Sequence, residues 1–246
     1  MTKQKNLPPN YIIQKNNLET NLHNFVTHVC NEKDGRYKSW EYCYDYFQKL
    51  FKKENPTGID KNYAALILGF FLASWGMLRN SFLLNCTYTV HQKAIDILLE
   101  HKLLLTKKII DNEYIEQFFG SKENDGLKQK LEKHYIVFKK RYQDPKTKNE
   151  RITQVLVSKI IMGISGLVPA YDRYVVTGLR ANGFCQTFNE TSYKQLLDLY
   201  KKNKKQIKDL QTAKNYKKYP PMKILDIYLW EEGRKLEEKK KKEKRK

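Results

Sequence analysis

Apolar residues recur at steps of three and four positions along almost the whole chain, a spacing typical of amphipathic helices. Alternating polar and apolar runs, which are typical of strands, are hard to find. The 11 glycines and 7 prolines are too few for the many turns of an all-β protein. The sequence therefore predicts an all-α fold, a compact bundle of about nine or ten helices that can divide into two helical lobes around a cleft.

The predicted organisation has three parts along the chain. Residues 1–18 form a polar leader, residues 19–234 a single α-helical domain and residues 235–246 a basic tail. Gly183 is expected to end the helix before it. Within the domain, helical spacing predicts helices over residues 18–30, 37–51, 60–78, 89–105, 127–142, 153–164, 172–182, 190–214 and 221–238, with the helix over 60–78 at the centre of the core.

Charge points to an anionic partner. The chain carries 47 Lys and Arg against 27 Asp and Glu, a formal net charge of +20. Residues 201–246 hold 18 of the basic and 7 of the acidic residues, so more than half of the excess lies there, and the rest of the chain stays basic. Nucleic acid, and DNA first, is the expected partner, although a tail of this kind also serves solubility alone.

The sequence lacks the features that are typical of several other classes of protein. The longest apolar run covers residues 64–78, shorter than a membrane-spanning helix, and the N-terminus is polar, so we expect a cytoplasmic protein without a membrane segment. The four cysteines and five histidines are scattered, and the motifs of nucleotide hydrolases, Rossmann enzymes, zinc proteases and α/β-hydrolases are absent. We therefore expect no metal, no cofactor and no disulfide framework.

Two segments stand out from this background. The first ends an apolar helix in small and polar residues, and on a helix Trp75 and Arg79 lie four apart on one face, an aromatic platform beside a cation. Trp75 as a core residue and Arg79 as a helix-end cation are the plainer interpretation. The second segment carries Asp172 after a proline-containing loop, with Tyr171 and Tyr174 around it. A helix N-cap is its plainer interpretation, although Val175 stands where a capping box has Glu or Gln.

Residues 152–176 resemble the catalytic segment of the helix-hairpin-helix DNA glycosylases. An apolar helix, a turn of small residues, Pro169, a short apolar stretch and Asp172 at a new helix follow the order of that family. The resemblance implies that Asp172 is the catalytic carboxylate. Residues 144–151, where the family has a glycine-rich hairpin, contain no glycine, and Lys159 is not at the position of the family's Schiff-base lysine. Lyase chemistry is therefore not expected. Because the sequence has no terminal cluster of four cysteines, an iron–sulfur cluster is not expected either.

If Asp172 acts in this way, its carboxylate stabilises the positive charge that develops on the sugar and orients or deprotonates water. A flipped base needs a pocket with stacking aromatics. The candidates for this pocket are Trp75, Tyr171 and Tyr174, and the candidates for binding the nucleic acid are Arg79, Lys159, Arg173 and Arg180.

Three functions remain open. The first is a monofunctional DNA glycosylase that releases a damaged or modified base, including a base of invading phage DNA. The second is a non-catalytic helical nucleic-acid-binding protein, in which Asp172 only caps a helix. The third is a helical scaffold or toxin-like nuclease, although no pair of acidic residues suited to a divalent metal lies on one helix face.

Overall fold

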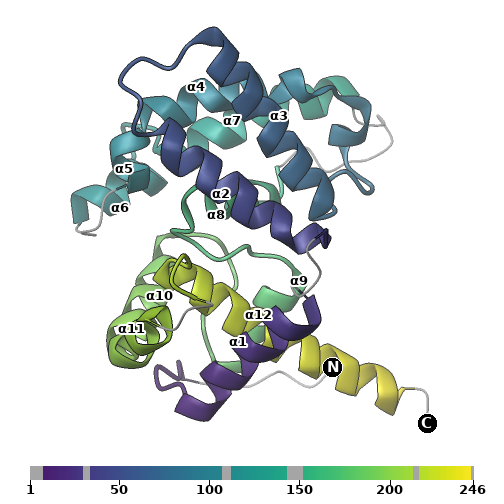
Figure 1. Ribbon diagram of the computed structural model, residues 1–246, viewed down its shortest axis with the longest axis vertical. Coiled ribbons are helices and arrows are strands. Elements are labelled where there is room, and N and C mark those ends of the chain that lie inside the picture. The colour runs from purple at the N-terminus through teal and green to yellow at the C-terminus, as the bar shows by residue number, and fades with distance from the viewer. Residues whose placement is uncertain (1–7, 30–33, 107–111, 143–151, 213–215, 245–246) are drawn as a thin grey trace. The chain divides into compact units, whose positions relative to one another are not determined.

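The computed structural model describes residues 8–29, 34–106, 112–142, 152–212 and 216–244. Over these residues the protein is all-α, with twelve α-helices, three short 3-10 helices and no strand, which confirms the predicted fold class. The helices form two compact units (Figure 1). Unit 1 combines residues 1–32 with 166–246, and unit 2 spans residues 33–165. None of the described helices is both long and apolar enough to cross a membrane.

Unit 2 is built around α2, α3 and α8, with α4 packed on α3 and α7 packed on α4. Trp40 and Gln48 of α2 tie this helix to α8, because their side chains donate to the carbonyls of Met162 at 3.0 Å and Ile164 at 3.0 Å. The elements of the unit are η1 (Arg36–Lys38), α2 (Ser39–Leu50), α3 (Gly58–Ser74), η2 (Phe82–Asn85), η3 (Tyr88–His91), α4 (Gln92–Glu100), α5 (Lys102–Thr106), α6 (Asn112–Phe119), α7 (Leu127–Tyr142) and α8 (Gln154–Ser165).

The two ends of α3 follow from local sequence, but its surroundings do not. Thr57 and Asp60 form a reciprocal capping box at its start. The prediction that this helix lies at the centre of the core holds for one face only, because an apolar stripe along the helix is exposed. An apolar composition all round a helix does not say which neighbours cover each face. Only the packing distinguishes the buried face with Leu68 from the exposed stripe. The stripe consists of Ile59, Tyr63, Leu66 and Phe70.

A buried histidine in unit 2 makes stability depend on pH. His91 is 3% exposed, and its Nδ1 lies 2.8 Å from the Tyr135 hydroxyl. Burial, with the nearby His134 adding to it, lowers the pKa of His91 from 6.5 to about 4. In the unfolded chain His91 is therefore protonated below about pH 6.5, whereas in the folded chain it is protonated only below about pH 4.

Stability should accordingly fall as the pH drops from 6.5 towards 4, by about 3 kcal/mol across this window. Urea denaturation at several pH values, followed by circular dichroism, measures the slope. His91→Gln should flatten it, with the remainder due to groups such as His134, whose pKa burial also lowers. Equal slopes for the two proteins would contradict this assignment.

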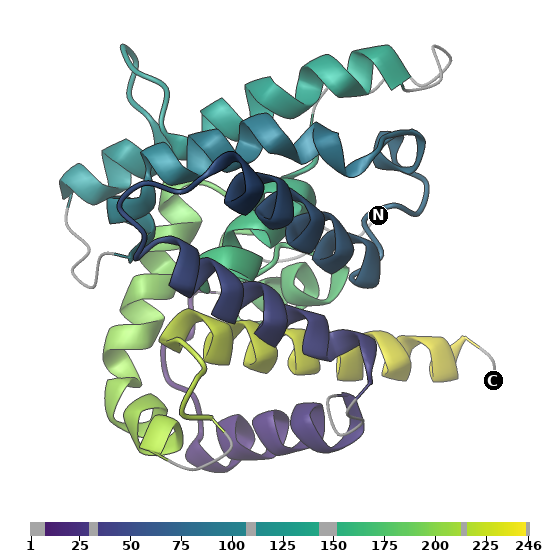
Figure 2. The ribbon, with the colours of Figure 1, turned by 45° about the horizontal axis from the view of Figure 1, so that its top comes forward.

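Unit 1 is organised around its last helix. Figure 2 shows α1 running beside α12. The shorter helix α9 also packs against α12. This crossing depends on glycine: a Cβ at Gly178 would overlap the carbonyl of Leu229, and one at Gly233 would overlap that of Tyr174. The elements of the unit are α1 (Lys15–Val29), α9 (Arg173–Ala181), α10 (Glu190–Lys202), α11 (Lys204–Thr212) and α12 (Pro221–Glu243).

The N-terminal segment of unit 1 is more than a polar leader. Asn203, 2% exposed, donates from Nδ2 to the Tyr11 carbonyl at 2.8 Å and accepts the Ile13 N–H at 3.0 Å. Gln206 donates to the Ile13 carbonyl at 2.9 Å. The prediction of one continuous helix over 190–214 is therefore wrong, because the helix is interrupted at Asn203. The Asn203 side chain bonds the backbone of the N-terminal segment instead of facing solvent.

The predicted boundaries at residues 18 and 234 do not coincide with the ends of secondary structure. Helix α1 begins at Lys15, and α12 continues through Glu243, so most of the basic tail is the exposed end of a long helix. Ion pairs along the helix support this extension, with Arg234 bonded to Glu231 at 2.8 Å and to Glu238 at 2.6 Å.

Candidate functional site

Asp172 is the N-cap of α9. Its Oδ1 accepts the backbone N–H of Tyr174 at 3.0 Å and of Val175 at 3.1 Å. The carboxylate is half-buried and lies at the positive end of the helix dipole. The helix ends as the sequence predicts, because Gly183 adopts φ +73° and the Phe184 N–H returns to the Leu179 carbonyl. The capping role of Asp172 is confirmed, and a catalytic role stays a prediction.

The loop before Asp172 is fixed to α12 by a buried charge. The Ala170 N–H donates to Oδ1 of Asp226 at 2.8 Å, and Oδ2 of Asp226 pairs with the Lys223 ammonium at 2.7 Å. The two side chains of this pair are only 4% and 1% exposed. Asp226 is thus a positioning residue for the loop that carries Asp172. Sequence reasoning missed it, although charged residues within an apolar helix face were a usable signal.

Replacing Asp226 should strongly destabilise the protein. Asp226→Asn keeps an oxygen for the Ala170 N–H but removes the negative charge beside a buried ammonium, which costs about 3–5 kcal/mol. The double variant Asp226→Asn with Lys223→Met removes both charges and should recover most of this loss. Urea denaturation followed by circular dichroism measures both variants. If the denaturation midpoint of the single variant equals that of the wild type, the buried pair does not stabilise the fold.

The two tyrosines beside Asp172 differ in exposure. Tyr171 is 1% exposed, its ring packs on Phe188, and its hydroxyl lies 2.6 Å from the Ser192 hydroxyl. Burial raises the pKa of the Tyr171 phenol. Tyr174 is half-buried, with its ring edge-on to Trp230. This placement gives Tyr171 a role in the core and leaves Tyr174 as the better candidate for stacking on a base.

The two arginines of α9 are exposed. Arg173 lies over the Tyr174 ring and donates to its hydroxyl at 3.0 Å, while Arg180 donates from Nε to Gln186 at 2.8 Å. Among the described residues neither guanidinium has an ion pair, so both are available to bind a phosphate. Their assignment as phosphate ligands remains a prediction.

Trp75 and Lys159 are packed together in unit 2. The Lys159 ammonium donates to the Trp75 carbonyl at 2.9 Å and lies 5.7 Å from the Trp75 ring centre. Trp75 also packs edge-on against Tyr37. Lys159 is only 6% exposed. This placement favours a structural role for Lys159 over contact with a phosphate.

The expectation that Trp75 and Arg79 share a helix face is wrong. Helix α3 ends at Ser74, and Gly76 adopts φ +75°, which only glycine takes without strain. The N–H groups of Gly76 and Met77 return to the carbonyls of Ala73 and Leu72 and close the helix. Because the chain turns at Gly76, the four-residue spacing to Arg79 has no helical meaning.

The predicted site residues divide between the units. Unit 1 brings together Tyr171, Asp172, Arg173, Tyr174 and Arg180, and unit 2 carries Trp75, Arg79 and Lys159. The grouping of the two sets around one base stays a prediction. The hairpin region at residues 144–151, which enters the family resemblance, lies outside the described residues.

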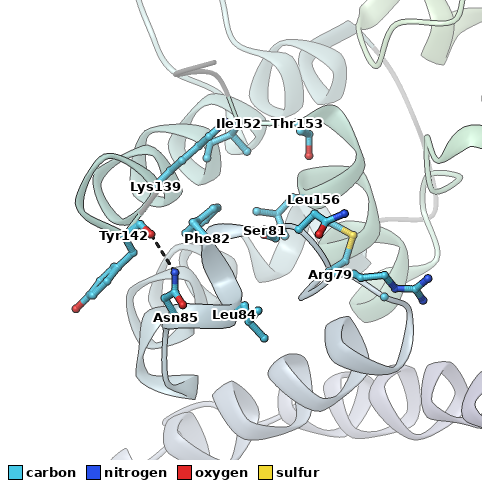
Figure 3. A pocket seen from close by; sticks show the side chains of 13 residues that line it. Arg79, Ser81, Phe82, Leu84, Asn85, Lys139, Tyr142, Ile152, Thr153 and Leu156 are labelled. Atoms are coloured by element: carbon cyan, nitrogen blue, oxygen red, sulfur yellow. Dashed lines mark hydrogen bonds between the residues drawn. The ribbon is translucent and has the colours of Figure 1, made fainter. Parts of the chain in front are cut away.

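Unit 2 contains a pocket of about 640 Å³ that sequence reasoning did not find (Figure 3). Arg79 and Tyr142 stand at opposite ends of it, and Phe82 and Leu156 lie between them. Lys139, 8% exposed, lines one side, and burial lowers its pKa. The pocket is lined by Gly76, Met77, Arg79, Asn80, Ser81, Phe82, Leu84, Asn85, Lys139, Tyr142, Ile152, Thr153 and Leu156.

Five lysines of unit 1 surround a shallow hollow at the junction of α10 and α11, with Asp209 as the acidic residue among them. All five are exposed, and Lys201 pairs with Asp198 at 3.4 Å. The interruption at Asn203 turns the two helices so that lysines from both meet. We call this set the lysine cluster: Lys201, Lys202, Lys204, Lys205 and Lys208.

Within the described residues, no group of three or more His, Cys, Asp and Glu side chains is arranged to hold a metal ion. Cys43 is buried, and Cys86 and Cys185 are half-buried thiols. Comparison with known proteins found no matching family model, curated protein or solved structure. The resemblance to the helix-hairpin-helix glycosylases therefore depends on the residues quoted above alone.

Proposed function

We propose that the protein binds DNA and releases a damaged or modified base by hydrolysis of the N-glycosidic bond, with Asp172 as the catalytic carboxylate. The observation that supports this proposal most is the placement of Asp172. Its carboxylate is half-buried on a loop that the buried Asp226 fixes to α12, as a preorganised charge requires. The cytoplasm is the proposed location.

The chemistry needs no metal. A carboxylate stabilises the developing positive charge on the sugar and orients or deprotonates the water that attacks it. Arg173 and Arg180, both exposed on α9, supply positive charge for the flanking phosphates. Tyr174, with its half-buried ring, is the candidate for stacking on the extruded base.

A base-release assay tests this function directly. The full chain is incubated without added metal on DNA carrying damaged bases and on phage DNA with natural modifications, and released bases are identified by mass spectrometry. Base release by the wild type is the expected result. DNA binding without release from any of these substrates would reject the glycosylase.

A second candidate is a non-catalytic nucleic-acid-binding protein. This candidate is favoured by the two hydrogen bonds that the Asp172 carboxylate accepts from backbone N–H groups. A helix cap alone is enough to explain an aspartate at this position. The exposed lysine cluster supplies the electrostatic contact in either case. The two candidates differ in one measurable respect, since only the first yields a free base.

A further inference from the structure

Helix α3 presents an apolar stripe that the described residues leave exposed. Its four members, Ile59, Tyr63, Leu66 and Phe70, are between 44% and 83% exposed although all of them are large and apolar. The helix packs into unit 2 through its opposite side, where Leu68 is buried. Single exposed apolar residues are common on any protein, but a continuous row of them marks a docking surface.

Neighbouring elements widen this surface. The ring of Tyr46 on α2 packs edge-on against the ring of Tyr63, with 5.3 Å between the ring centres. Tyr42, one turn earlier on α2, is exposed. Tyr88 of η3 lies beside Gly69 of α3, since a Cβ at Gly69 would be 3.8 Å from that of Tyr88. The stripe is therefore the centre of an aromatic and apolar patch formed by three elements.

The stripe is uncharged, although the chain has a net charge of +20. The two charged residues of α3 are both paired outside the helix, Asp60 with Lys53 at 2.7 Å and Lys61 with Asp96 at 2.8 Å. DNA binding depends on cations, and helices that lie on membranes are rich in lysine and arginine. The partner that fits α3 is therefore a protein with an apolar face of its own.

The spacing along the stripe is the same in both directions. Its members are four, three and four residues apart, which is the spacing of a coiled-coil seam. If a second α3 lies antiparallel on the first, Ile59 meets Phe70 of the second copy, and Tyr63 meets Leu66 of the second copy. Each layer then pairs an aromatic ring with an aliphatic side chain. Such a stripe complements itself about a two-fold axis, as the interface of a symmetric dimer requires.

From this exposure, neutrality and symmetry we propose that α3 forms the interface of a homodimer, in which the stripes of two copies pack antiparallel. One helix on another gives a contact near the low end of interface sizes, about 1,200 Å² in total, so we expect a dissociation constant in the micromolar range. The inference does not rest on base release, because no residue of the stripe belongs to the candidate site. Two lysine clusters in one particle would allow bivalent binding to DNA.

Sedimentation equilibrium of the full chain, freed of nucleic acid, tests the proposal from about 1 µM to about 100 µM protein, a range that brackets this affinity. The mass should rise with concentration from 29.4 kDa towards twice that value. Both copies are strongly basic, so added salt screens their repulsion and should tighten the dimer, whereas salt weakens DNA binding. A monomer at every concentration would overturn the proposal, and so would a dimer that salt dissociates. A monomer that binds phosphatidylcholine vesicles would assign the stripe to a lipid surface instead.

Charge variants at the centre of the stripe locate the interface. Leu66→Glu and Tyr63→Lys should each weaken dimerisation about tenfold or more, because each homodimer would place two charges against apolar side chains. The matched controls Val137→Glu and Val137→Lys put the same charges at an exposed apolar residue of α7, outside the stripe, and should dimerise like the wild type. Circular dichroism verifies that each variant is folded. Equal losses in the stripe variants and the controls would show a net-charge effect and overturn the assignment.

A mixture of the two stripe variants tests the antiparallel arrangement. In the mixed dimer the new carboxylate at position 66 of one chain faces the new ammonium at position 63 of the other, and the second pair of Tyr63 and Leu66 is unchanged. The mixture should therefore dimerise at least about fivefold more tightly than either variant alone. A mixture that dimerises no better would overturn the antiparallel arrangement. These measurements involve neither DNA nor base release, so the failure of either proposal is seen separately.

Discussion

Asp172→Asn is expected to lower the rate of base release by about 10²- to 10⁴-fold, the usual contribution of a positioned acid or base. Asparagine caps helices as well as aspartate does, so α9 should keep its two capping hydrogen bonds. The substitution therefore separates the charge of the carboxylate from its structural role. Mass spectrometry of released bases measures the rate, and a filter-binding assay should show unchanged DNA affinity.

Two further variants complete this test. Asp172→Ala removes the cap and the charge together and should lower stability by about 1 kcal/mol in addition. Thr57→Ala removes the cap of α3 and should lower stability by a similar amount without slowing base release. If Asp172→Asn released bases at the wild-type rate, Asp172 would be a helix cap only. Unfolding of this variant would likewise favour a structural role.

Replacing four residues of the lysine cluster with glutamine should greatly weaken DNA binding. Each lysine that contacts a phosphate contributes about 0.9 to the slope of log affinity against log salt, so loss of four should reduce that slope by about 3 to 4. The substituted residues are Lys202, Lys204, Lys205 and Lys208, which are exposed and without an ion pair in the described part of the chain. Fluorescence anisotropy with labelled duplex DNA at several salt concentrations gives the slope.

The matched control removes the same charge from the end of α12. Lys239, Lys241, Lys242 and Lys244 are also exposed, and their replacement by glutamine should have the smaller effect. Equal losses in the two variants would show that DNA responds to net charge and not to the lysine cluster. A larger loss in the α12 variant would place the main contact on the C-terminal helix instead.

The sequence by itself determined the features that depend on neighbours along the chain. Helical spacing and the scarcity of glycine and proline predicted an all-α protein, and the helix over 127–142 has the predicted bounds. The cap at Asp172 and the helix end at Gly183 were also readable. These features follow from backbone geometry and from hydrogen bonds within a few residues, and so local patterns are sufficient to specify them.

Only the tertiary structure decided what each side chain faces. It buried Tyr171 and Lys159 and tied the loop before Asp172 to Asp226. It also brought residues of the 76–85 segment, of the end of α7 and of the start of α8 together around one pocket. The backbone of Tyr11 and Ile13 bonds the Asn203 side chain, at the break in a helix that periodicity predicts as continuous. Periodicity says that a face is apolar or polar but not which distant segment covers it, because that choice depends on shape, buried charge and hydrogen-bond partners far apart in sequence.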